Sequence, residues 1–217
     1  MTTTPRRGAD RASLRDQAAA CQRPERRAAV LTAEQIGRML AIAEPRDAAL
    51  VAVLAAGACR IGEALLLCWS DLDSAGRVTI PGSITKTGRS RAFTLPPQAL
   101  QHVNRWQPLC PASQRGWIFP GAPVRQPLST RAGQLAVQRL ANQLGLQGVS
   151  SHSFRRSALT AAHQAGLSLR ALAEISGHQS LAALERYLDA DAARAQAEEA
   201  RSLLFQANTK APAIPVH

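Results

Sequence analysis

Carboxylates are missing from the middle of this chain. Residues 74–173 contain 11 Arg and one Lys but no Asp or Glu, whereas residues 1–73 carry 10 Arg against 9 acids. Residues 174–217 are slightly acidic, and the whole chain of 217 residues has a net charge of +11. An arginine-rich genome would add Arg but would not remove acids from one segment only. The imbalance indicates a continuous positive surface that faces a polyanion, and nucleic acid fits best.

Cysteine and long apolar runs are also scarce. The 4 Cys show neither C-x-x-C nor Cys/His ligand spacing, which argues against a disulfide framework or a zinc site and predicts reduced thiols. No apolar run is long enough to span a membrane, and the first residues lack the apolar stretch of a signal peptide. The sequence therefore predicts a cytoplasmic protein without a membrane partner, associated with the nucleoid when it binds DNA.

Two residue types are nearly absent. The chain has 24 Arg but only two Lys, Lys86 and Lys210, and Tyr187 is its only tyrosine. Arg cannot give up a proton at useful pH whereas Lys can, so a Lys kept in mid-chain can serve as an amine. A lone Tyr usually packs by its ring with the hydroxyl at the surface. Chance and packing explain both residues until the surrounding motifs are considered.

What the sequence does contain is mainly helical patterning. Its apolar content is 46%, much of it Ala and Leu, which favours helix. In residues 77–96 apolar side chains recur at every second position, which predicts two strands joined at residues 85–90 with a turn at Gly88. The predicted fold class is mainly α with a small antiparallel sheet (α+β). Helices are predicted over residues 31–40, 47–56, 60–68, 96–106, 129–145, 150–166, 167–177 and 180–205.

The length predicts one folded domain with tails. Residues 1–30 are polar and Arg-rich, which is typical of a flexible basic tail. Thr32 and Gln35 have the spacing of a capping box, so the folded domain is predicted to begin at this helix. We expect this domain to occupy residues 31–190, followed by a C-terminal helix and tail over residues 191–217.

Six polar side chains are candidates for a functional site, although each has a structural explanation of its own. Arg60 can pair with Glu63 three residues later, and His152 can belong to a helix cap. His178 can close the turn after Gly177. The six candidates are Arg60, Lys86, His152, Arg155, His178 and Tyr187.

Together the six residue types fit phosphoryl transfer. Two Arg and one or two His can stabilise the extra charge of a pentavalent phosphate without a metal. A Tyr hydroxyl can act as the nucleophile, and a Lys amine can protonate the leaving 5′ oxygen. A phosphotyrosine keeps the energy of the ester, so rejoining needs no nucleotide. The set predicts DNA cleavage and rejoining with no metal and no cofactor.

The motifs around these residues resemble the tyrosine recombinases, the phage integrase family. The stretch GACRIGEALLLCWSDLD resembles the first arginine box, which implies a catalytic Arg60 supported by Glu63. ITKTGRSRAFTLP resembles the β-hairpin with the general-acid lysine, here Lys86.

The two remaining boxes follow in the family's order. SHSFRRSALTAAHQAG resembles the H-x-x-R box with His152 and Arg155, and SGHQSLAALERYL resembles the terminal box with His178 and the nucleophile Tyr187. Any one box is weak evidence, but four boxes in order across residues 31–190 are specific.

The resemblance implies the family's catalytic-domain fold and double-stranded DNA as the substrate. It also implies a homotetramer on DNA that exchanges its C-terminal segment between subunits. Most members carry a separate DNA-binding domain ahead of the catalytic one, whereas thirty residues precede Leu31. The chain therefore resembles the shorter members, such as fimbrial-switch invertases, and an accessory DNA-binding protein is a further expected partner. Arg89 and Arg91 beside the hairpin tip, and Arg156, are expected to contact DNA.

Two other functions stay open. The short helices separated by Gly166 and Gly177 can be read as a helix-turn-helix, which fits a non-catalytic DNA-binding regulator. A type IB topoisomerase-like enzyme would use the same chemistry without exchanging strands. The sequence leaves open the DNA site and the choice among integration, inversion and excision.

Overall fold

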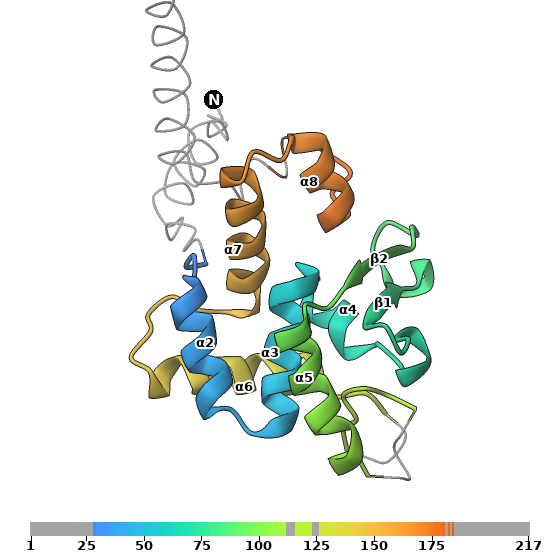
Figure 1. Cartoon of the computed structure of the whole chain (residues 1–217), viewed down its shortest axis with the longest axis vertical. Helices are drawn as coiled ribbons and strands as arrows, with labels where there is room; N and C mark the ends of the chain where they lie inside the picture. The colour runs from blue at the N-terminus through green and yellow to red at the C-terminus, as the bar shows by residue number, and fades with distance from the viewer. Residues whose placement is uncertain (1–27, 112–115, 123–125, 181, 183, 185–217) are drawn as a thin grey trace, which may run out of the picture.

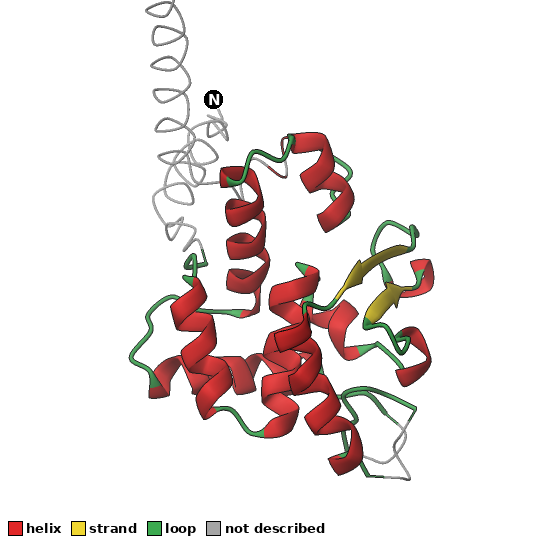
Figure 2. Cartoon of the chain, in the orientation of Figure 1, coloured by secondary structure: helices red, strands yellow, loops and turns green. Residues whose placement is uncertain are grey.

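The structure is a computed structural model that describes residues 28–111, 116–122, 126–180, 182 and 184. Within these residues, helices pack around one central helix, and a two-stranded antiparallel sheet lies at one side (Figures 1 and 2). The predicted fold class is confirmed. In chain order the elements are α2 (Ala33–Ile42), α3 (Pro45–Gly57), α4 (Ile61–Leu65), η1 (Trp69–Asp71), β1 (Arg77–Ile80), η2 (Gly82–Ile84), β2 (Arg91–Thr94), α5 (Pro97–Trp106), η3 (Gln107–Leu109), α6 (Thr130–Gln143), α7 (Ser151–Gln164) and α8 (Leu169–Ser176).

Helix α3 lies at the centre of the main core. Residues 48–54 are all apolar and all buried, so each face of this helix needs a neighbour, and α2, α5, α6 and α7 supply them. Asp47 is buried at the first turn. Its carboxylate accepts hydrogen bonds from Arg46 Nη2 at 2.9 Å and from Arg139 Nη2 of α6 at 2.8 Å. A buried carboxylate with two cationic partners is satisfied, so Asp47 ties α3 to α6.

The predicted capping box at the start of α2 is confirmed. Thr32 Oγ1 accepts from Gln35 N at 3.2 Å, and Gln35 Oε1 accepts from Thr32 N at 3.0 Å. The preceding Leu31 is buried, and its amide donates to Ser157 Oγ of α7 at 2.6 Å. The beginning of the folded part is therefore attached to the helix that carries Arg155. The predicted tails cover residues 1–30 and 191–217, and the last helix was predicted over residues 180–205. Of these, residues 1–27, 181, 183 and 185–217 lie outside the described residues.

The predicted hairpin is confirmed as strands β1 and β2, with Val78 opposite Phe93 and Ile80 opposite Arg91. Phe93 packs against the end of α3 at Gly57, where an added Cβ would overlap the phenyl ring. Only glycine lets the sheet approach the central helix this closely.

The helix predicted over residues 60–68 is shorter in the structure. Helix α4 ends before Leu67, whose carbonyl accepts a hydrogen bond from Ile118 N at 2.9 Å. Cys68 N then donates to Asp71 Oδ2 at 2.8 Å. The prediction was wrong here because the Cys68 amide, which would donate to the Ala64 carbonyl in a longer helix, donates to Asp71 instead, and Cys68 pairs with the distant Trp117 in an isolated β-bridge.

Helices α7 and α8 form a second, smaller packing unit. Leu159, Leu172 and Leu184 form an apolar cluster separate from the main core. Figure 1 shows α7 extending away from the other helices and α8 lying across its far end, on the side of β2. No helix among the described residues combines the length and apolar character needed to cross a membrane.

Candidate active site

Arg60 is held at the start of α4 by Glu63. Glu63 Oε2 accepts from the backbone N of Arg60 at 2.8 Å, and Oε1 accepts from Arg60 Nη1 at 2.9 Å. An acidic side chain at the third helical position reaches back to the capping residue in this way. The Arg60 side chain is 31% exposed, so its guanidinium is fixed along one edge and open to a ligand along the other.

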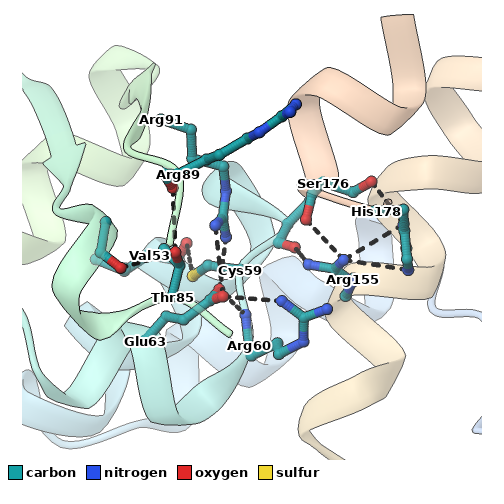
Figure 3. A network of polar contacts seen from close by, with 12 residues as sticks. Val53, Cys59, Arg60, Glu63, Thr85, Arg89, Arg91, Arg155, Ser176 and His178 are labelled. Carbon is teal, nitrogen blue, oxygen red and sulfur yellow. Dashed lines mark hydrogen bonds and ion pairs between the residues drawn. The ribbon is translucent and has the colours of Figure 1, made fainter. Parts of the chain in front are cut away.

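Glu63 also binds a second arginine, Arg91 of β2 (Figure 3). Arg91 Nη2 donates to Oε2 at 2.5 Å, and Nη1 donates to Oε1 at 3.4 Å. Burial alone would raise the pKa of the Glu63 carboxyl, but the hydrogen bonds from Arg91 and Arg60 outweigh it, so the pKa is lowered. Glu63 therefore stays ionised, and the two arginines and one carboxylate together carry one net positive charge.

Arg155 is almost fully buried, with 1% of its surface exposed. Its Nη1 donates to the carbonyl of Ala58 and its Nη2 to the carbonyl of Ser176, both at 2.7 Å. Ala58 follows Gly57, the last residue of α3, and adopts the left-handed conformation with φ 45°. Arg155 thus connects the end of α3, two residues before Arg60, to the end of α8.

His178 lies against Arg155, just beyond the left-handed Gly177 that ends α8. Ser176 Oγ donates to the Leu172 carbonyl at 2.7 Å, which occupies its hydrogen. At its 2.7 Å contact with His178 Nδ1, Ser176 Oγ must therefore accept, so Nδ1 carries the proton. The other ring nitrogen, Nε2, lies 3.2 Å from Arg155 Nη2.

Lys86 is exposed in the loop between β1 and β2. The loop is folded on itself: Thr85 Oγ1 donates to the carbonyls of Gly82 at 3.0 Å and Arg89 at 3.1 Å. Gly88 has φ 68°, as the predicted turn requires, and its carbonyl lies where a Cβ on Gly82 would be. Local contacts therefore shape the loop that presents Lys86.

The structure brings together some of the predicted site residues. Arg60 and Glu63 belong to one hydrogen-bonded network and Arg155 and His178 to a second, and the two meet where Arg155 binds the carbonyl of Ala58, two residues before Arg60 (Figure 3). His152 is exposed in the first turn of α7, three residues before Arg155, a spacing that places both on one side of the helix. Lys86 and His152 stand outside the network drawn in Figure 3. Tyr187 lies outside the described residues.

The three arginines expected to contact DNA differ in their surroundings. Arg89 is exposed, as a DNA contact requires. Arg91 is only 11% exposed and pairs with Glu63, so a buried carboxylate occupies this guanidinium. Arg156 is half-buried, and its Nη1 donates to the Ala28 carbonyl at 2.6 Å. Arg156 is therefore attached to the chain that leads into α2.

Two residues of this region were not singled out by the sequence. Cys59 is completely buried between Ala58 and Arg60; burial, and next the charge of Glu63, raise the pKa of its thiol to about 12, so it is a neutral packing group. Ser176 is also buried, and it orients His178. Ser176 lies on the buried face of α8 with Leu172. A polar residue on this otherwise apolar face is the sequence feature that could have identified it.

The arrangement can bind one phosphate group. Arg60 offers an open guanidinium edge and the site carries excess positive charge, the features that recognise phosphate oxygens. In the described part of the chain, no group of three His, Cys, Asp or Glu side chains is arranged to hold a metal ion.

Comparison with known proteins identifies close relatives of the sequence. Tyrosine recombinase XerC of Bradyrhizobium diazoefficiens is 34% identical over 152 residues, which cover 69% of this chain and 47% of the relative. XerC of Methylobacterium sp. strain 4-46 is 37% identical over 154 residues, with the same two coverages. The chain spans about half of the length of these relatives.

Solved structures share the fold. XerA recombinase matches with a TM-score of 0.68 and 22% identity, over 83% of this chain and 66% of XerA. XerH bound to palindromic difH substrate in a post-cleavage complex matches with a TM-score of 0.67 and 23% identity, over 81% of this chain and 52% of XerH. The model of the phage integrase family covers residues 29–194. With the sequence, the fold and the arginine–histidine cluster in agreement, this chain belongs to the phage integrase family.

Proposed function

We propose that this chain is a site-specific DNA recombinase that cleaves and rejoins double-stranded DNA through a covalent 3′-phosphotyrosine. The observation that carries the proposal is the position of Arg155, a buried guanidinium held between two carbonyls within reach of His178 and beside the segment of Arg60. Burying a charged side chain is costly unless hydrogen bonds or opposite charges compensate it, so a buried guanidinium points to a specific role. The XerC, XerA and XerH relatives support the same reading.

In the proposed reaction the Tyr187 hydroxyl attacks the scissile phosphorus and gives its proton to water. The bond from phosphorus to the 5′ oxygen breaks, and Lys86 protonates that oxygen as it leaves. Arg60 and Arg155, helped by His152 and His178, stabilise the charge on the non-bridging oxygens. A 5′ hydroxyl from another strand reverses these steps, and the ester energy is retained.

One experiment separates this function from its alternatives. The protein is incubated with nicked duplexes that carry candidate sites, and the products are run on a denaturing gel. A covalent protein–DNA band excludes a non-catalytic regulator. A two-site assay then distinguishes a recombinase, which joins strands from different duplexes, from a topoisomerase-like enzyme, which reseals the same strand. Stable binding without a covalent band would support the regulator instead.

Cleavage is expected to proceed at an unchanged rate in EDTA and without nucleotide. The proposed site stabilises phosphate charge with Arg and His side chains, whereas two-metal enzymes use cations held by carboxylates. The measurement is single-turnover adduct formation with EDTA or with Mg²⁺ at matched ionic strength. A strict requirement for Mg²⁺ in the chemical step contradicts the proposed mechanism.

We propose that the acid-free segment, residues 74–173, forms the main DNA-contacting surface, with Arg89 as one of its phosphate contacts. The logarithm of the binding constant should fall by about 0.9 per neutralised phosphate for each unit of log salt. Arg89→Ala should reduce that slope by about one unit. Arg38→Ala, an exposed arginine on α2, is the matched control and should leave it unchanged. A flat salt dependence of DNA binding, or equal effects of both substitutions on the slope, would show that the positive charge of residues 74–173 does not contact DNA phosphates.

We also propose that the protein works as a homotetramer on paired sites, with residues 191–217 exchanged between subunits and residues 1–30 acting as a basic tail. The loss of excess positive charge after the basic segment supports this assignment: residues 174–217 hold 6 acids against 4 basic residues, so they have no net electrostatic attraction to DNA. An accessory DNA-binding protein is a second proposed partner.

A further inference from the structure

Arg91 occupies a position that links separate parts of the proposed site. It is the first residue of β2 and follows directly after the loop that carries Lys86. Both terminal nitrogens of its guanidinium donate to Glu63, 28 residues earlier in the chain. The same carboxylate holds the backbone amide and the guanidinium of Arg60. A displacement of β2 would therefore also displace Arg60, because Glu63 binds both Arg91 and Arg60.

The two arginines on Glu63 are not equivalent. Arg91 is 11% exposed and binds both carboxylate oxygens with its two terminal nitrogens, whereas Arg60 is 31% exposed and uses one guanidinium nitrogen. Arg91 is thus the inner cation, and its charge offsets that of Glu63. Without it, the full negative charge of Glu63 would act on Arg60 and compete with a phosphate for the same guanidinium.

Arg91 also lies near the end of α8. Gly177 has no side chain, but a Cβ placed there would lie 3.4 Å from Arg91 Nη1 and 3.7 Å from its Cδ and Cζ. Gly177 immediately precedes His178 and has φ 68°, the conformation that favours glycine. The side chain that neutralises Glu63 therefore also lies close to the turn that places His178.

We propose that Arg91 is a positioning residue for DNA cleavage, which aligns Arg60 through Glu63 and keeps the positive charge of Arg60 available to the scissile phosphate. This inference rests on the proposed strand-transfer function. It replaces the expectation that Arg91 contacts DNA, since the charge of its guanidinium is offset by the buried carboxylate of Glu63, whereas Arg155 binds neutral carbonyls. Arg91 acts on the phosphate only through Arg60.

The test measures two properties of each variant on a nicked duplex: the rate of adduct formation at saturating DNA, and the salt dependence of binding. Arg91→Ala should lower the saturated rate by roughly 100-fold, the cost expected when a reacting group is slightly misplaced. Its salt slope should stay that of the unchanged protein, because no phosphate contact is lost. Arg38→Ala controls for removal of one arginine and should alter neither property.

Arg91→Lys guards against a folding defect, because it keeps a positive charge beside Glu63 but cannot donate from two nitrogens of one plane. We expect a folded protein with a saturated rate roughly tenfold below that of the unchanged protein, between the Ala variant and the original. A Lys variant that cleaves at the original rate would overturn the proposal. So would a salt slope reduced by about one unit at a normal saturated rate, since that pattern marks a direct phosphate contact.

A double-substitution cycle with Glu63→Gln identifies the route of the effect. If Arg91 acts through Glu63, Arg91→Lys should change the rate by less than about threefold once the carboxylate is an amide, although it costs about tenfold in the original background. Equal factors in both backgrounds would overturn the route. The denaturant midpoints for unfolding of the unchanged protein, the two single variants and the double variant report the strength of the Arg91–Glu63 contact without using catalysis. If the unchanged protein forms no adduct, the proposed function fails, while these midpoints still test the contact.

Discussion

Tyr187→Phe should abolish the covalent protein–DNA adduct and lower strand cleavage by roughly 10⁴-fold or more, as removal of a nucleophile does in other covalent enzymes. The substitution removes one oxygen and keeps the ring, so packing is little changed. Tyr187 is the only tyrosine of the chain, and no other phenol can replace it. The adduct is measured on a denaturing gel with end-labelled nicked DNA.

Binding of the same DNA provides the control for Tyr187→Phe. The variant should retain its affinity and salt dependence, since the phenol hydroxyl carries no charge at neutral pH. Loss of binding together with cleavage would mean that the substitution disturbed the fold. An adduct that persists in the Phe variant would remove Tyr187 from the mechanism.

Arg155→Ala should be the most damaging substitution in the arginine pair of α7, for two reasons. It removes a guanidinium proposed to bind the scissile phosphate, which should lower cleavage by roughly 10³-fold. It also leaves the carbonyls of Ala58 and Ser176 without their buried donor, which should cost about 3 kcal/mol in the free energy of unfolding. Denaturant unfolding and single-turnover cleavage measure the two effects separately.

Arg156→Ala is the neighbouring comparison. On a helix, Arg156 points about 100° away from Arg155, and the structure attaches it to the carbonyl of Ala28. Its loss should cost about 1 kcal/mol in stability. The saturated cleavage rates of the two variants should differ by roughly 100-fold or more. Equal losses, or a larger loss for Arg156→Ala, would reverse the assignment.

The elements that the sequence predicted well depend on local chemistry. Thr32 and Ser129 cap α2 and α6 through hydrogen bonds to residues three positions later, and Gly88 and Gly145 adopt the positive φ that ends a turn or a helix. Such contacts are visible in a short window of sequence. The length of α4 depends on the bridge between Cys68 and Trp117, which is distant in the chain, and was therefore misjudged.

The residues of the candidate site likewise divide into those with partners nearby in the sequence and those with distant partners. Arg60 and Glu63 could be paired from their spacing, and the family motifs indicated Arg155 and His178. The partner of Arg91 is 28 residues away, and Arg155 bonds to a carbonyl 97 residues away. No pattern of residue types encodes which backbone carbonyl a guanidinium will reach. The catalytic roles of all six candidates stay predictions, whereas the proximity of Arg60, Arg155 and His178 is a feature of the fold.

The connection that Arg155 makes between α3 and α8 has a consequence for how many molecules are active at any moment. Helices α7 and α8 share a small apolar cluster of their own, so α8 has little apolar burial to hold it against the rest of the protein. If α8 separates, Arg155 loses the Ser176 carbonyl and His178 leaves the site. A site assembled in one molecule out of ten works at roughly a tenth of its full rate. A neighbouring subunit or a bound duplex that keeps α8 in place would therefore raise activity without contacting any reacting group.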